Sequence, residues 1–204
     1  PRNPNVVYSA GFYHNINRAD VSSVDARGRA QSVSITPRLG PADGYLRGQW
    51  LSPIVMSVHN PDVLYFGGQY MFRSWNRGDN WERISADLTY NDPKQLGDGP
   101  YQTVFALSES PMRFGLLYAG TDDGRLLLVT AGAKPRVVAA GKRPSVLRIR
   151  LSSDESRAAV LRADASLSIL QMTSGLIVGE SPGTRPGGAG VNGLLPGLDA
   201  SFET

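Results

Sequence analysis

Short apolar runs separated by turn-forming residues dominate the chain. The segments NPDVLYFGG and KPRVVAAG are typical: a few Val, Leu, Tyr or Phe residues stand between Asn, Asp, Gly or Pro. β-Branched and aromatic residues favour strands, and the residues that flank them favour tight turns. Signals for amphipathic helices, with apolar residues three and four positions apart, are nearly absent. The pattern therefore predicts an all-β protein made of short strands.

One of these patterns recurs along the sequence. NPNVVYSAG (3–11) returns as NPDVLYFGG (60–68) and more loosely as SPMRFGLLYAG (110–120), which aligns Tyr8, Tyr65 and Tyr118. A fainter copy spans residues 146–175. Four short antiparallel strands that recur every ~40–55 residues are typical of the blades of a β-propeller. A β-sandwich with coincidental repeats is the alternative.

The best copy sets the expected boundaries. Its four strands are predicted at 51–57, 63–67, 70–74 and 81–85. We therefore expect a partial β-propeller over residues 1–180, with four-stranded antiparallel blades at about 1–40, 46–88, 101–140 and 145–180. Residues 181–204 are rich in Gly and Pro without periodicity, which predicts a flexible tail. An incomplete set of blades exposes an apolar face, so further blades or self-association are the expected partners.

The turn after the third strand of that copy has a distinctive composition. It reads SWNRGDNW from Ser74 to Trp81. Asn76 is placed to accept hydrogen bonds from backbone amides, and Gly78 is suited to a positive φ angle. Ser74 is expected to close the turn with its hydroxyl group, and Trp81 to bury its ring against the neighbouring sheet.

This turn closely resembles the Asp-box of BNR repeats, with Asn76 where that family usually has Asp. Residues 45–85 resemble bacterial sortilin-like BNR propeller proteins, and looser similarity covers residues 1–130. The resemblance implies a propeller whose boxes are structural turns away from the ligand face, in a bacterial, exported or periplasmic protein. The first and third copies lack the box, and the fourth copy looks more like a WD-type repeat.

Composition removes several classes of function. The chain of 204 residues has no Cys and two His, and its net charge is +3. Thiol chemistry is excluded, and His14 and His59 alone leave little for a zinc site. We expect neither a metal nor a cofactor: the one Gly-rich match, Gly188 to Gly193, follows no strand and precedes Pro196. The mild charge gives no indication of nucleic acid as a partner, and no apolar run approaches the ~20 residues of a membrane span.

The sequence gives little support for a pair of catalytic carboxylates. A glycosidase needs two carboxyl groups on either side of the scissile bond. The available groups, Asp122/Asp123, Asp154/Glu155 and the loop residues Asp87, Asp92 and Asp98, are interpreted as turn or loop residues. A sialidase would carry an Arg-Ile-Pro segment, which this sequence lacks. No catalytic residue is assigned, and a fragment of a BNR-repeat glycoside hydrolase remains the alternative function.

The favoured function is a non-catalytic module that binds a protein, peptide or glycan. The stretch that enters the first strand of the best copy contains Tyr45, Arg47 and Trp50. Tyr, Arg and Trp are enriched at binding hot spots, so these three residues are the candidate ligand-binding set. The alternative is that Trp50 packs between blades and Arg47 bonds to loop carbonyl groups.

Overall fold

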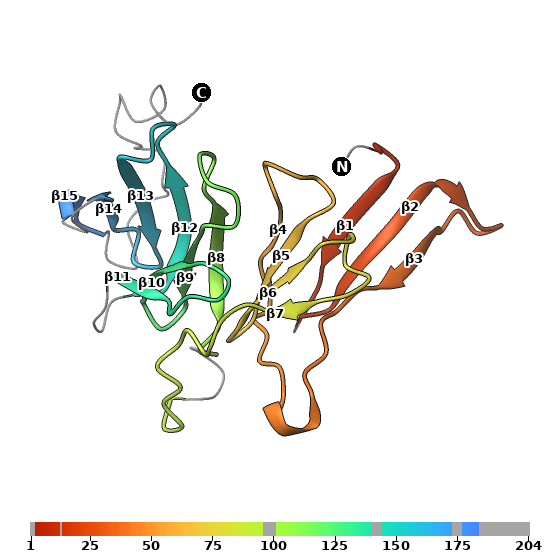
Figure 1. Cartoon of the computed structure of the whole chain (residues 1–204), viewed down its shortest axis with the longest axis horizontal. Coiled ribbons are helices and arrows are strands. Elements are labelled where there is room, and N and C mark those ends of the chain that lie inside the picture. Colours follow the sequence, from red (N-terminus) through yellow and green to blue (C-terminus); the bar gives the residue numbers. More distant parts are fainter. Residues whose placement is uncertain (1–2, 13, 96–100, 140–143, 173–176, 184–204) are drawn as a thin grey trace.

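The protein is all-β, as predicted. The computed structural model describes residues 3–12, 14–95, 101–139, 144–172 and 177–183, which form four small antiparallel sheets (Figure 1). Within these ranges the single helical element is a short 3₁₀ turn, Pro41–Asp43. Of the predicted tail, residues 184–204 lie outside the described part of the chain.

The four sheets follow one another along the sequence. Sheet 1 holds β1 (Val6–Ala10), β2 (Ile16–Val24) and β3 (Ala30–Ser34). Sheet 2 holds β4 (Ile54–Met56), β5 (Leu64–Gly67), β6 (Met71–Ser74) and β7 (Glu82–Arg83). Sheet 3 holds β8 (Val104–Glu109), β9 (Leu117–Thr121), β10 (Leu126–Val129) and β11 (Arg136–Ala139). Sheet 4 holds β12 (Val146–Leu151), β13 (Arg157–Arg162), β14 (Leu167–Gln171) and β15 (Ile177–Ser181).

Each sheet is a meander in which every strand pairs with the next strand of the sequence. Sheet 1 departs from the expectation of four strands, because its described part contains three. The repeat explains the difference. Tyr8 of β1 aligns with Tyr65 of β5 and Tyr118 of β9, so β1 corresponds to the second strand of the later sheets.

Apolar clusters join each sheet to the next one, and the sheets lie side by side in sequence order (Figure 1). Buried residues at the three interfaces include Ile16, Ile35, Leu64, Phe66 and Phe72 between sheets 1 and 2, Tyr65, Met71, Val104 and Leu127 between sheets 2 and 3, and Tyr118, Leu126, Val146 and Val160 between sheets 3 and 4. Sheets 1 and 4 stand at opposite ends of the row. The described residues therefore form an open series of sheets.

Two glycines set the closeness of this stacking. A Cβ atom on Gly67 would lie 2.8 Å from the Val104 side chain, and one on Gly120 would lie 2.3 Å from that of Val146. Val104 and Val146 are the first residues of β8 and β12. The first strand of each of these sheets thus docks where the second strand of the preceding sheet has no side chain.

Two of the aligned tyrosines link neighbouring sheets. The hydroxyl group of Tyr65 donates a hydrogen bond to Glu109 Oε1 (2.8 Å), and that of Tyr118 donates to Glu155 Oε2 (3.2 Å). In both cases the carboxylate belongs to the following sheet. Burial, supported by the Glu155 charge, raises the pKa of Tyr118 to about 12.

The turn from Ser74 to Trp81 has the geometry expected from its residues. The Ser74 hydroxyl oxygen accepts a hydrogen bond from the Gly78 amide (2.8 Å), and Asn76 Oδ1 accepts one from the Asn80 amide (3.0 Å). Gly78 has a φ of 94°. Trp81 was expected to be buried, and the structure shows it partly buried, less exposed than Trp75. Its indole nitrogen donates to the Ile35 carbonyl oxygen (2.6 Å), and its ring packs on Phe66.

Replacing Trp81 with Ala should lower the free energy of unfolding by about 3 kcal/mol, because the substitution removes a large ring from the contact between sheets 1 and 2. Trp75→Ala is the matched control, since Trp75 lies in the same turn with half of its surface exposed. Urea unfolding of both variants measures the effect. Equal losses in the two variants would contradict this role for Trp81.

Stability should fall as the pH rises from about 10 to 12. An unfolded tyrosine loses its proton near pH 10, whereas Tyr118 in the folded protein holds its proton to about pH 12. Unfolding then releases a proton in this pH range, so the free energy of unfolding decreases as the pH rises. The urea midpoint of Tyr118→Phe, measured between pH 8 and 12, should depend less steeply on pH than that of the parent. Parallel curves would argue against a buried, neutral Tyr118.

Candidate functional site

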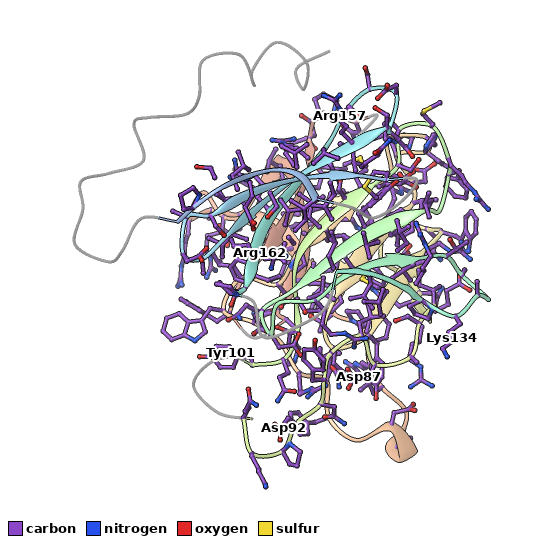
Figure 2. The ribbon with its side chains drawn as sticks, turned by 90° about the vertical axis from the view of Figure 1, so that its left-hand side faces the viewer. Asp87, Asp92, Tyr101, Lys134, Arg157 and Arg162 are labelled. Carbon is purple, nitrogen blue, oxygen red and sulfur yellow. The ribbon has the colours of Figure 1, made fainter. Side chains whose placement is uncertain are left out.

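The two longest connections between sheets lie at one end of the molecule. They run from β3 to β4, through the 3₁₀ turn, and from β7 to β8 (Figure 1). Figure 2 shows Asp87, Asp92 and Tyr101 of the second connection at this end. All three residues of the predicted ligand-binding set, Tyr45, Arg47 and Trp50, lie in the first connection.

Arg47 is buried, and both terminal nitrogens of its guanidinium group bond to the second connection. It forms an ion pair with Asp87 and donates hydrogen bonds to Asn91 Oδ1 (3.0 Å) and Thr89 Oγ1 (3.2 Å). The side chain is 7% exposed. Its partners in the structure are protein groups, and a contact between Arg47 and a ligand stays a prediction. Its position ties the two connections together.

The backbone from Tyr45 to Arg47 is held by Gln69 of sheet 2. Gln69 Oε1 accepts a hydrogen bond from the Arg47 amide (2.8 Å), and Gln69 Nε2 donates to the Tyr45 carbonyl oxygen (2.8 Å). Residue 68, just before Gln69, has to be glycine for the loop to come this close to sheet 2. A Cβ atom on Gly68 would lie 2.9 Å from the Arg47 carbonyl oxygen. The turn between β5 and β6 thus fixes the loop that carries Tyr45.

Asp122 plays in sheet 3 the part that Gln69 plays in sheet 2: its side chain holds loop residues, here from both connections. Its carboxylate accepts hydrogen bonds from the amides of Tyr101 (2.8 Å) and Thr103 (2.8 Å) and from Gln49 Nε2 (2.9 Å). Burial raises the pKa of Asp122, and the two backbone hydrogen bonds oppose that shift. Asp122 was expected as a turn residue; it does lie in the β9–β10 turn, and it also positions residues of two other segments.

Trp50 stands beside this network with half of its surface exposed to solvent. Its indole nitrogen donates to the Tyr101 hydroxyl oxygen (2.5 Å), and its backbone amide donates to Gln49 Oε1 (2.8 Å). The Phe12 ring meets the Trp50 ring edge to face at 5.3 Å between centroids. Trp50, Phe12 and Leu51 are 50%, 61% and 65% exposed. We call Phe12, Trp50, Leu51 and Tyr101 the aromatic surface.

Sequence reasoning placed Trp50 in the candidate set but did not identify the residues that contact it. Phe12 precedes Trp50 by 38 positions in the sequence and Tyr101 follows it by 51, and no local pattern joins them. Gln69 and Asp122 occupy matching places two residues after Gly67 and Gly120, so the repeat held a signal for their shared role. Tyr45 is 70% exposed. Of the predicted set, Tyr45 and Trp50 present side chains to solvent.

The remaining candidates are bound within their own loops. Asp92 accepts hydrogen bonds from the Lys94 amide and Gln95 Nε2, and Asp154 accepts from the Ser152 hydroxyl and the Ser156 amide. Asp98 lies outside the described residues. Arg148 and Arg150 are exposed on β12. Within the described ranges no group of three metal-ligating side chains is found, and no helix is long and apolar enough to cross a membrane.

Comparison of the sequence with family models and with curated proteins found no match to either.

Arg47→Ala should lower the free energy of unfolding by about 3 kcal/mol, because it leaves Asp87 partly buried without its cation. Arg83→Ala is the control: the ion pair of Arg83 with Asp43 (2.7 Å) is exposed, and such pairs contribute about 0–1 kcal/mol. Urea unfolding compares the two variants. A loss in Arg47→Ala no larger than in the control would show that the buried pair does not hold the connections together.

Proposed function

We propose that the chain is a non-catalytic binding module, that its ligand is a protein, peptide or glycan, and that the ligand docks on the aromatic surface. The observation that carries the proposal is the state of Trp50. Its ring is half exposed and yet held by Tyr101 and Phe12, and its backbone amide is held by the Gln49 side chain. An exposed aromatic residue that is already ordered loses little conformational entropy on binding, which is the property of a hot spot.

The chemistry of this surface suits a ligand with both apolar and polar parts. The rings of Trp50 and Phe12 offer apolar area, to which the face of a sugar ring or an aromatic side chain fits. Exposed Tyr45 extends the first connection with a further ring and hydroxyl group. Asp122, below the surface, fixes both Gln49 and Tyr101 and so serves as a positioning residue.

The carboxylates at this end favour binding over catalysis. A glycosidase needs one carboxyl group that carries a proton and a second one that attacks or activates water. Asp87 pairs with Arg47, Asp92 caps its own loop, and Asp123 accepts hydrogen bonds from Thr121 and the Tyr90 amide. These carboxylates are occupied by protein donors, so they are poorly placed to act on a substrate.

We also propose that the architecture is part of a β-propeller of the BNR type. Support comes from the four meander sheets in sequence order, from the docking of β8 and β12 on a glycine of the preceding sheet, and from the repeated tyrosine. The hydrogen bonds of Ser74, Asn76 and Gly78 match the physics of an Asp-box turn. In a propeller the connections that enter the first strands meet on one face, which is where the aromatic surface lies.

The proposal predicts that Trp50→Ala weakens ligand binding at least tenfold and leaves stability nearly unchanged, because the ring is half exposed. Gel electrophoresis of the full chain through a panel of soluble polysaccharides, with a peptide array beside it, identifies the ligand class. Release of reducing sugar from the same polysaccharides tests the hydrolase alternative.

Trp75→Ala is the matched control, since Trp75 is equally exposed on another turn. If Trp50→Ala binds as the parent does while Trp75→Ala does not, the aromatic surface is the wrong site. Hydrolysis of any of the polysaccharides would contradict the proposal of a non-catalytic module and support the glycoside hydrolase alternative.

A further inference from the structure

A pocket of about 410 Å³ lies between sheets 3 and 4. Its volume falls in the range of sites for small molecules, about 300–1,000 Å³. Part of the lining is apolar and consists of Leu116 of the β8–β9 loop, Leu128 of β10 and Met172, which follows β14. All of the lining residues belong to these two sheets and to the turns within them.

Three cationic side chains line the same pocket. They are Arg113 of the β8–β9 loop, Lys134 of the β10–β11 turn and Arg136 of β11. All three residues are exposed. In the part of the chain that the structure describes, none of the three forms an ion pair with a carboxylate. Their charge is therefore available to a ligand.

The carboxylate of the lining, that of Glu155, is held by protein donors. Its Oε1 atom accepts hydrogen bonds from the Ser110 hydroxyl group and from the Met112 amide (3.1 Å). Its Oε2 atom accepts one from the Tyr118 hydroxyl group (3.2 Å). Because three cations and one carboxylate line the pocket, its net charge is positive and attracts anions.

The interface between sheets 2 and 3 shows the same space filled by protein groups. Tyr65, Arg73 and Glu82 are neighbours on adjacent strands of sheet 2. Arg73 Nε pairs with Glu82 Oε1 (2.6 Å), and the guanidinium group lies over the Trp75 ring, 4.4 Å from its centroid. The Trp75 ring packs on Phe114 of the β8–β9 loop at 5.6 Å between centroids. At that interface the positive charge is thus neutralised and covered.

The matching row of sheet 3 has a different charge. Tyr118, Leu128 and Arg136 are the neighbours on β9, β10 and β11. Leu128 stands in the place of Arg73, and Arg136 stands in the place of Glu82. The row therefore keeps a cation and loses the carboxylate that would neutralise it.

The side chains that fill the earlier interface also have smaller counterparts here. Thr130 occupies the place of Trp75, because each follows the middle residue of its row by two positions. The β8–β9 loop supplies the Phe114 ring to the earlier interface, whereas the corresponding β12–β13 turn supplies Glu155. The pocket is therefore the space that two aromatic rings fill one interface earlier.

We propose that this pocket binds a small molecule that carries a phosphate monoester on an apolar body. A phosphate monoester has a charge of about −1.5 to −2 near pH 7, which matches the excess of cations in the lining. Arg113 and Arg136 suit this group, since a guanidinium fork donates to two phosphate oxygens at once. The apolar body packs on Leu116, Leu128 and Met172.

Other ligands fit the pocket less well. A cation would meet three like charges, and Glu155, the group that could attract it, already accepts three hydrogen bonds. A monoanion would leave part of the positive charge unmatched. Figure 2 shows Lys134 on the other side of the ribbon from Tyr101 of the aromatic surface. The inference thus concerns a second site and does not depend on the proposed function.

Phenyl phosphate tests the proposal, because it joins a phosphate monoester to one apolar ring. The full chain, isotopically labelled at its methionine methyl groups, reports binding by nuclear magnetic resonance. Met172 lines the pocket, and Met71 is buried between sheets 2 and 3. The Met172 resonance, assigned with Met172→Leu, should shift saturably, while that of Met71 should stay in place.

Matched ligands separate the charge from the apolar body. Phenyl sulfate has nearly the same shape and a single charge, and it should bind at least fivefold more weakly than phenyl phosphate. Neutral benzyl alcohol should bind at least tenfold more weakly. Inorganic phosphate, which lacks the apolar body, should also bind at least fivefold more weakly.

Four variants of the chain locate the site. Arg136→Gln should weaken phenyl phosphate at least fivefold, whereas Arg148→Gln, the matched control on exposed β12 outside the pocket, should not. Glu155→Gln should strengthen binding, because it removes the negative charge of the lining. Thr130→Trp copies Trp75 and should abolish binding by filling the pocket without a change of charge. Thermal melting confirms that each variant is folded.

Several results would overturn the proposal. The first is a Met172 resonance that phenyl phosphate does not shift at millimolar concentrations. Equal losses in Arg136→Gln and Arg148→Gln would show a general attraction to a basic surface. Phenyl sulfate that binds as tightly as phenyl phosphate, or folded Glu155→Gln that binds more weakly than the parent, would contradict a site for a dianion. Tighter binding of a phosphotyrosine peptide than of phenyl phosphate would assign the site to a protein segment instead of a small molecule.

Discussion

The fit of a valine against a glycine determines how the sheets of this protein stack. At Gly67 and Gly120 any side chain would collide with Val104 or Val146, the first residue of the next sheet. The contact brings the backbone of the second strand of one sheet directly against the first strand of the following sheet. Protein interiors are close-packed, so this spacing also decides which other side chains meet between the sheets. The apolar clusters around Tyr65 and Tyr118 follow from it.

The same contact organises the end of the molecule that carries the aromatic surface. Val104 docks beside Gly67, and its amide donates to the Gly68 carbonyl oxygen (2.8 Å). The chain just before Val104 is thereby brought next to the turn of sheet 2 that holds Arg47 through Gln69. Asp122 then ties Tyr101 and Gln49 together across the two sheets. The stacking of the sheets therefore decides where Trp50 lies. Gln69 and Asp122, from matching turns, hold the loop segments around it.

The strands and turns could be predicted because they depend on residues close together in the sequence. The site was harder to predict because its residues are far apart in the sequence. β-Branched runs and Asn, Asp and Gly turns gave the four strands of residues 46–88, although β4 and β7 are shorter than expected. The hydrogen bonds of Ser74 and Asn76 are local and followed from their spacing. The ion pair of Arg47 was not predicted, because its partner Asp87 lies 40 residues away and nothing local tells a buried arginine from an exposed one. For the same reason Phe12 and Tyr101 could not be assigned to Trp50.

The first interface shows how the structure compensates where the repeat is incomplete. Ala10 stands in place of the docking glycine, Met56 stands in place of Glu109, and among the described residues β1 pairs with β2 alone. The contact between sheets 1 and 2 instead uses large rings: Phe66, Phe72 and Trp81 pack with Ile16 and Ile35. Trp81 adds a hydrogen bond to the Ile35 carbonyl oxygen, and Arg18 pairs with Asp79 (2.8 Å). These contacts lie toward β2, β3, β6 and β7. Tyr8 of β1 and Ile54 and Met56 of β4 pack at the margin of this cluster and stay partly buried, so an apolar groove remains between β1 and β4.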